Sequence, residues 1–144
     1  MTDVPLDESV VRYASPRHVD GGRVLGGAFV ARPNDPTISV NRPAVFSNDA
    51  EQAMACIREL SRLKIKATGR YAEIPVEEII EALSDIQEMQ ALKVQEDALA
   101  ATPDFQADPS HALIVGLPND NGPLAELCGD IIAQKISRVH SAIL

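Results

Sequence analysis

The side chains best suited to chemistry in this sequence are arginines and histidines, and half of them lie in one early stretch. The stretch from Arg12 to Arg42 holds five of the nine arginines and one of the three histidines. Arginine binds phosphate and carboxylate groups through paired hydrogen bonds, so arginines beside neighbouring turns can meet around one anion. The candidate anion-binding residues are Arg12, Arg17, His18, Ser39, Arg42 and His111. The competing interpretation is that these arginines are solvated or paired with carboxylates, among them Asp20 and Asp35.

Two smaller patterns within this set suggest particular roles. The tetrapeptide Ser39-Val40-Asn41-Arg42 would place a hydroxyl, an amide and a guanidinium together at a strand end, although it also fits a strand that simply enters a turn. His18 and His111 are the candidate acid–base pair, because histidine titrates near neutral pH. His111 begins an expected strand, and the competing interpretation is a histidine capped there by Asp108 or Ser110.

No motif completes a catalytic or cofactor site. The sequence has no Cys-x-x-Cys, no His-x-x-x-His and no calcium-type loop, so we expect no metal. The pairs Gly21-Gly22 and Gly26-Gly27 lack the spacing of a phosphate-binding loop or a dinucleotide fingerprint, and no helix is expected after them, so we expect no cofactor. Cys56 and Cys128 fall on apolar faces of expected helices, which favours buried thiols over a disulfide.

Charge is unevenly distributed along the chain. The net charge is −8 and the pI about 4.8, which argues against general binding to nucleic acid or anionic membranes. Residues 73–108 carry ten acids against one base, Lys93. The helical part of this segment offers a surface for a basic protein partner, and its candidate residues are Glu77, Glu78, Glu81 and Asp85. The competing interpretation is a solvated helix face.

Length and composition fit a single domain. The chain has 144 residues, which is near the common domain size. Residues 1–8 carry three acids and Pro5, and we expect them to form a flexible arm ahead of one domain spanning 9–144. No signal-peptide pattern is present and no apolar run approaches the ~20 residues of a membrane helix, so we expect a cytoplasmic protein without membrane contact.

The first forty-odd residues predict a three-stranded antiparallel meander. Strand patterns cover residues 10–13, 23–31 and 37–40, and turn residues separate them at 20–22 and 33–36. The turn Asp20-Gly21-Gly22 is of the hairpin type, because glycine accepts a positive φ. Gly26-Gly27 interrupts the second strand, which indicates a bulge or a close approach by another backbone or a ligand.

The rest of the chain predicts three helices and further strands. Apolar residues at helical spacing predict helices over 49–63, from 76 to between 85 and 90, and over 123–143. Apolar runs predict strands at 71–74 and 111–116, a strand is possible at 64–68, and 91–95 fits either helix or strand. Gly129 indicates a close packing contact, and His140 on the last helical turns would suit the helix dipole. We therefore expect an α+β fold: a mostly antiparallel sheet packed on one face by two or three helices, including a long C-terminal helix.

Two functions from different classes fit these observations. The leading one is a non-enzymatic protein-binding or assembly module that acts through a protein partner or as a homodimer. Its support is the missing catalytic constellation, the uneven charge and the wide apolar stripe of the expected terminal helix. The alternative is a small enzyme or sensor that binds a nucleotide-like or phosphate-bearing anion. That alternative requires the arginine and histidine candidates to converge in a concave pocket.

Overall fold

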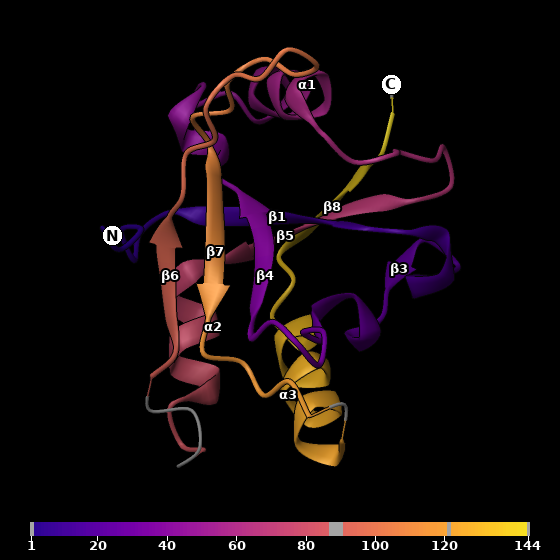
Figure 1. Cartoon of the computed structure of the whole chain (residues 1–144). Coiled ribbons are helices and arrows are strands. Elements are labelled where there is room, and N and C mark those ends of the chain that lie inside the picture. Colours follow the sequence, from indigo (N-terminus) through magenta and orange to yellow (C-terminus); the bar gives the residue numbers. More distant parts are fainter. Residues whose placement is uncertain (1, 87–90, 121, 144) are drawn as a thin grey trace.

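The computed structural model describes residues 2–86, 91–120 and 122–143, and it has the α+β architecture that the sequence predicts (Figure 1). In chain order the elements of this described part are β1 (Ser9–Ala14), η1 (Pro16–His18), β2 (Val19–Asp20), β3 (Arg23–Val24), η2 (Gly26–Phe29), β4 (Thr37–Asn41), η3 (Pro43–Val45), α1 (Ala50–Leu60), β5 (Arg70–Pro75), α2 (Val76–Leu83), β6 (Lys93–Glu96), β7 (His111–Val115), α3 (Pro123–Gln134) and β8 (Arg138–Ser141), where η denotes a 3-10 turn.

Six strands form one antiparallel sheet in the order β6-β7-β4-β1-β5-β8. Val11 on β1 lies opposite Asn41 on β4 and opposite Glu73 on β5, so β1 is a central strand. The short strands β2 and β3 pair only with each other. They form the predicted hairpin, whose turn contains Gly21 and Gly22 at φ values of 59° and 80°.

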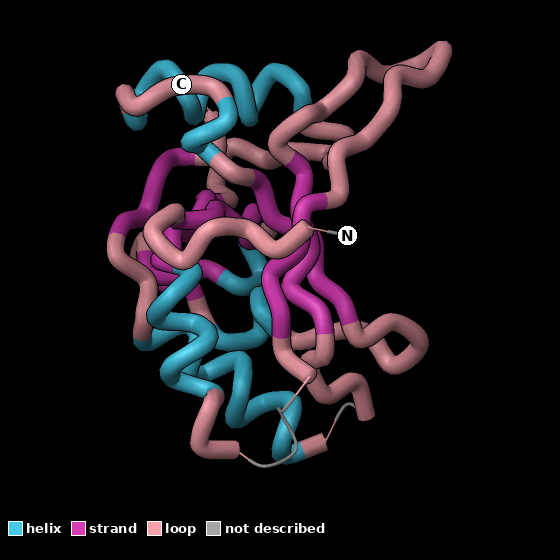
Figure 2. Tube along the Cα trace, turned by 90° about the vertical axis from the view of Figure 1, so that its left-hand side faces the viewer, coloured by secondary structure: helices cyan, strands magenta, loops and turns pink. Residues whose placement is uncertain are grey.

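The two faces of the sheet carry separate cores, because side chains alternate between faces along each strand. One face, with Val10 and Ala14 of β1, packs against α2, α3 and η2 and forms the larger core. The opposite face, with Val11 of β1, packs against α1 through Met54 and forms a smaller core. Figure 2 shows strands lying between α1 and the other two helices. The expectation of helices on one face is therefore wrong for α1.

Two predicted helices are found, with revised ends. Asp49 caps α1, since its Oδ1 accepts hydrogen bonds from the backbone nitrogens of Glu51 (2.9 Å) and Gln52 (3.1 Å). This helix ends at Leu60 rather than 63. The second helix, α2, begins at Val76 as predicted and ends at Leu83, where turns follow to residue 86. Residues 87–90, which the prediction left open as a helix end, lie outside the described residues.

The predicted N-terminal meander is wrong in its middle strand. Residues 23–31 form the short strand β3 and then the 3-10 turn η2, and β4 pairs directly with β1. A side chain of the preceding strand β1 helps to hold this turn, because Nε of Arg12 donates to the carbonyl of Ala28 at 2.8 Å. The local apolar pattern of residues 23–31 therefore predicts a strand, whereas contacts with other parts of the chain stabilise a turn.

The turn η2 packs unusually closely on α3 through two glycines. A Cβ atom on Gly129 would lie 2.5 Å from the carbonyl oxygen of Gly26 and 3.1 Å from Cγ2 of Val30. A Cβ atom on Gly26 would in turn lie 2.9 Å from the backbone nitrogen of Asp130. The close approaches predicted at Gly26 and Gly129 are thus confirmed, and they are made against each other.

The predicted long C-terminal helix is also wrong. The helix α3 ends at Gln134, and residues 138–141 form β8 on the edge of the sheet beside β5. Backbone pairing explains the change, since Ser137 N donates to the carbonyl of Glu73 at 2.8 Å. His140 therefore sits on a strand, with its Nε2 2.7 Å from Oε1 of Glu73, and does not act on a helix dipole.

The segment expected as an N-terminal arm lies along β6. Val4 N donates to the carbonyl of Val94, Glu96 N donates to the carbonyl of Thr2, both at 2.8 Å, and the Val4 side chain is 3% exposed. The undecided residues 91–95 contain the start of this strand, whereas the possible strand at 64–68 is absent. At the opposite edge, β8 has no outer strand neighbour in the described ranges. No described helix is long and apolar enough to cross a membrane.

Candidate anion-binding site

The six predicted anion-binding residues do not converge on one place. Arg12 lies between Val10 and Ala14 on the face of the larger core. Ser39 lies between Ile38 and Val40, whose side chains enter that core, so the Ser39 side chain points to the opposite face. His111 is on the Ser39 side as well, because its Cα partner is Asn41, which is itself paired with Val11 of the smaller core. The remaining candidates, Arg17, His18 and Arg42, are placed by the turns that follow β1 and β4.

Arg42 is neutralised by two carboxylates. Its Nε and Nη2 donate to the two carboxylate oxygens of Glu8 at 2.9 and 2.8 Å, and its Nη1 donates to Oε1 of Glu96 at 2.9 Å. The hydrogen bond to Glu8 is the main reason why the pKa of Arg42 is raised. Arg42 thus has no nitrogen left without a partner, and its assignment to an anion site is corrected to a structural ion pair.

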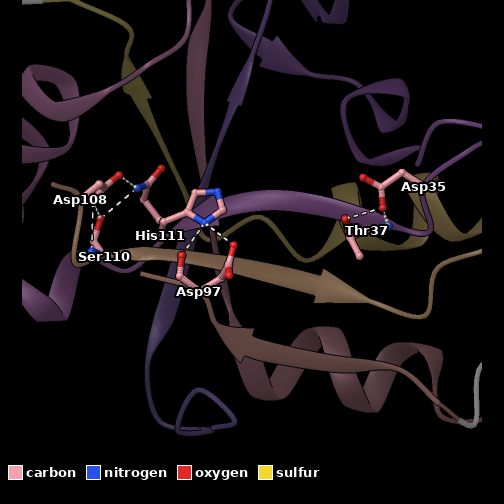
Figure 3. Close-up of polar contacts among 7 residues, drawn as sticks. Asp35, Thr37, Asp97, Asp108, Ser110 and His111 are labelled. Atoms are coloured by element: carbon pink, nitrogen blue, oxygen red, sulfur yellow. Dashed lines mark hydrogen bonds and ion pairs between the residues drawn. The ribbon is translucent and has the colours of Figure 1, made fainter. Parts of the chain in front are cut away.

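His111 is held by a carboxylate of its own. Its Nδ1 lies 2.9 Å from the carbonyl of Asp97 and 3.1 Å from Oδ2 of the same residue (Figure 3). Both atoms accept hydrogen bonds, so Nδ1 carries the proton. The predicted caps, Asp108 and Ser110, bond instead to each other and to the amide of Asn41. The structure therefore places His111 in a polar network on the face away from the larger core and does not pair it with His18.

Arg12 occupies the centre of a different arrangement. Its Nε donates to the carbonyl of Ala28 in η2 and its Nη1 to the carbonyl of Ser39 in β4, each at 2.8 Å. The residue as a whole is half-buried. Desolvation, followed by the nearby charge of Arg32, lowers the pKa of Arg12 to about 10. The group therefore remains a cation at neutral pH, held by neutral carbonyls.

His18 is seated beside this guanidinium by η1 and η2. Pro16 starts the 3-10 turn η1, in which His18 N donates to the carbonyl of Ser15 at 2.9 Å. The imidazole lies against Gly27, where a Cβ atom would come within 2.8 Å of Nδ1 and 2.9 Å of Cε1. Burial, followed by the charges of Arg17 and Arg12, lowers the pKa of His18. The imidazole is therefore neutral at neutral pH, and Gly27 leaves room for it.

We call Arg12, Arg17, His18 and Arg32 the Arg12 cluster. The causes of the shifted pKa values of Arg12 and His18 are burial and neighbouring arginines, and no carboxylate is among them. Asp35, expected as a counter-ion, accepts hydrogen bonds from the backbone and hydroxyl of Thr37 instead (Figure 3). The cluster is a concentration of positive charge without a described negative partner in an acidic protein.

Several donors of the Arg12 cluster point to solvent. A buried side-chain nitrogen or oxygen without a hydrogen-bond partner would be shielded from solvent as well. Within the described part of the chain, Nε of Arg62 is the one such atom, and it is not part of the cluster. Nη2 of Arg12 and the ring nitrogens of His18 form no hydrogen bond with a described residue, so these atoms reach solvent. Arg17 and Arg32 are exposed. Arg32 belongs to the arginine-rich stretch from Arg12 to Arg42, although it is not one of the six candidates named from the sequence.

The predicted partner-binding residues lie together on the surface. Glu77, Glu78 and Glu81 are exposed on α2, and Asp85 is exposed just beyond its end. Oε2 of Glu78 is 3.8 Å from Nζ of Lys135, a weak surface ion pair. This acidic face of α2 is accessible to a partner.

The described surface also has two pockets whose linings contain none of the six candidate anion-binding residues. One of about 270 Å³ is lined by residues such as Arg58, Ile65 and Ile143, and one of about 580 Å³ by residues such as Glu8, Ser47 and Glu73. No three histidine, cysteine or carboxylate side chains of the described residues are grouped to hold a metal ion.

Comparisons with protein-family models, with curated proteins and with solved structures find no match to this chain.

Proposed function

We propose that the protein is a non-enzymatic binding module that recognises a phosphate- or carboxylate-bearing anion at the Arg12 cluster. One observation carries the proposal: the cationic guanidinium of Arg12 is held by the carbonyls of Ala28 and Ser39, and no described carboxylate pairs with it. Its partners within the chain are neutral carbonyls that do not cancel its charge, so the group is a candidate for binding an anion. Nη2 of Arg12 reaches solvent and is available to donate to the ligand.

Binding is favoured over catalysis because the acid–base candidates are divided. His18 belongs to the Arg12 cluster, whereas His111 and the Ser39 side chain lie on the other face of the sheet. The two pockets described above are lined by other residues, and the exposed side chains of Arg17 and Arg32 make the cluster accessible to a charged group. The convergence that an enzyme would require is missing from this set of residues.

A thermal-shift and calorimetric comparison tests the anion site. Phosphate, a nucleoside monophosphate and acetate at millimolar concentration should raise the melting temperature if any of them occupies the cluster. Arg32→Gln should weaken binding by roughly 10–100-fold, the value of one charge-assisted hydrogen bond. Arg138→Gln makes the same charge change on exposed β8 and is the matched control. Equal losses in both variants, or no ligand effect in the wild type, would contradict the proposal.

Charge complementarity favours a second proposal, which is self-assembly through the same cluster. The acidic face of α2 is exposed and could supply the carboxylates that occupy the Arg12 cluster of a second copy. Such a contact joins two different surfaces and is therefore heterologous. Sedimentation velocity at low and high salt tests it: the association should weaken with salt and in Glu77→Gln/Glu81→Gln. A monomer at every salt concentration would rule out self-assembly and leave small-anion binding intact.

A further inference from the structure

We propose that the anion recognised by the Arg12 cluster is a phosphate group, and that His18 takes up a proton when the phosphate binds. The inference rests on the anion site proposed above and adds the chemical class of its ligand and a linked proton. Three features of the cluster support it: its number of charges, the fixed positions of its donors, and the signs of the charges around His18.

The number of charges favours phosphate over carboxylate. Arg12, Arg17 and Arg32 supply three cations, and protonated His18 would supply a fourth. A carboxylate brings a single negative charge and two oxygens in one plane. A phosphate monoester brings nearly two negative charges and three acceptor oxygens arranged around phosphorus. Its charge and its three oxygens therefore match a group of several cationic donors better than a carboxylate does.

The two inner donors are already in position before any ligand arrives. Hydrogen bonds to the carbonyls of Ala28 and Ser39 hold the Arg12 guanidinium in place. Contact with Gly27 restricts the His18 ring, and Leu25 N donates to the carbonyl of His18 at 2.8 Å. Donors fixed by the fold lose little freedom on binding, so more of their interaction energy appears as affinity.

The neighbours of His18 explain why its protonation is linked to the ligand. The charged groups that act on the ring are Arg17 on η1 and Arg12 on β1, and the turn η2 packed against it contains no titratable side chain. Asp20 on β2 is exposed. Both arginines disfavour the imidazolium, whereas a phosphate dianion beside the ring would favour it. Phosphate binding should therefore raise the His18 pKa and draw one proton toward the ring.

Isothermal titration calorimetry with inorganic phosphate measures this proton directly. Titrations near neutral pH, in phosphate-free buffers that differ in ionisation enthalpy, give the number of protons exchanged on binding. We expect the wild type to take up a substantial fraction of one proton more than His18→Gln, a variant that keeps a polar side chain. This difference cancels the protons that come from phosphate itself. Toward lower pH, wild-type affinity should gain up to about tenfold per pH unit over His18→Gln.

Gly27→Ala is an independent second variant. Its new Cβ atom would meet the His18 ring at 2.8 Å and displace it, while the carbonyl partners of Arg12 are unchanged. Proton uptake should fall as in His18→Gln, with phosphate binding weakened but retained. This variant keeps the proposal testable if His18→Gln folds poorly.

The outcomes separate this inference from the anion site itself. Phosphate binding with the same proton uptake in the wild type and in both variants would overturn the role of His18 and leave the anion site intact. Acetate binding as tightly as phosphate would overturn the ligand class. If phosphate neither binds to the wild type nor raises its stability, the proposed anion site is overturned as well. Comparing inorganic phosphate with a nucleoside monophosphate shows whether the phosphate is free or part of an ester.

Discussion

The contact between Gly129 and Gly26 gives the sharpest test of the fold, because its expected sign is opposite to the usual one. Replacing a glycine within a helix by alanine normally stabilises a protein by about 1 kcal/mol. In α3 the added Cβ atom of Gly129→Ala would lie 2.5 Å from the Gly26 carbonyl oxygen and 3.1 Å from Cγ2 of Val30. The nearer atom is backbone, so relief requires η2 to move away from α3.

The magnitude follows from two opposing terms. Overpacking a buried contact costs typically about 1–3 kcal/mol, and a backbone atom at this distance favours the upper half of that range. Subtracting the helix-propensity gain of about 1 kcal/mol leaves a net loss of about 1–2 kcal/mol. For a chain of this size, that loss lowers the melting temperature by roughly 3–8 °C. Because η2 also supplies the Ala28 carbonyl to Arg12, anion binding should weaken too.

Urea unfolding, monitored by circular dichroism, measures the loss. The midpoint should fall while the m-value stays constant, since the surface exposed on unfolding is unchanged. Ala55→Gly, at an exposed position of α1, measures the propensity term in this protein without a steric contact. If Gly129→Ala is as stable as the wild type or more stable, the close packing of η2 on α3 is wrong.

Three further predictions concern other contacts. Glu8→Gln removes one charge from the partly buried pair with Arg42 and should destabilise the protein by about 1.5–3 kcal/mol in urea unfolding, and a double-mutant cycle with Arg42→Met should show coupling. Burial raises the pKa of Tyr71, so the folded state favours the neutral phenol, and stability should fall as pH rises above about 10. Denaturation at several alkaline pH values checks this, and Tyr71→Phe should remove that fall. Arg62→Ala should speed amide hydrogen exchange in the loop around Phe105, because Arg62 bonds to two carbonyls of that loop and stacks on the ring at 5.4 Å; unchanged exchange would contradict the anchor.

The elements that sequence reasoning found are those whose pattern is long and local. Helical spacing identified α1 and α2, and the apolar run from His111 identified β7. The two segments whose secondary structure was predicted wrongly have a common physical cause. Residues 23–31 and 136–143 each carry a pattern compatible with more than one structure, and partners far away in the chain decide between them. For the first these are Arg12 and Gly129, and for the second it is the backbone of β5.

The positions of the candidate site residues depend on local and distant contacts in the same way. Arg12, Arg17 and His18 fall within seven residues, and a single strand and turn bring them together. Arg42 and His111 were misassigned because their carboxylate partners cannot be read from nearby residues. Glu8 is 34 residues from Arg42, and Asp97 is 14 residues from His111. Which arginine in an acidic chain keeps its charge available is therefore a tertiary property.

The unequal edges of the sheet set a limit on growth by strand addition. On one side, Thr2 and Val4 of the chain itself already occupy the backbone groups of β6 that another strand would need. On the other side, β8 is the outermost described strand. A protein with two open edges can extend a sheet indefinitely from copy to copy, as fibrils do. Here β6 is covered by the chain's own N-terminal residues, so β8 is the described edge strand at which a second copy could pair.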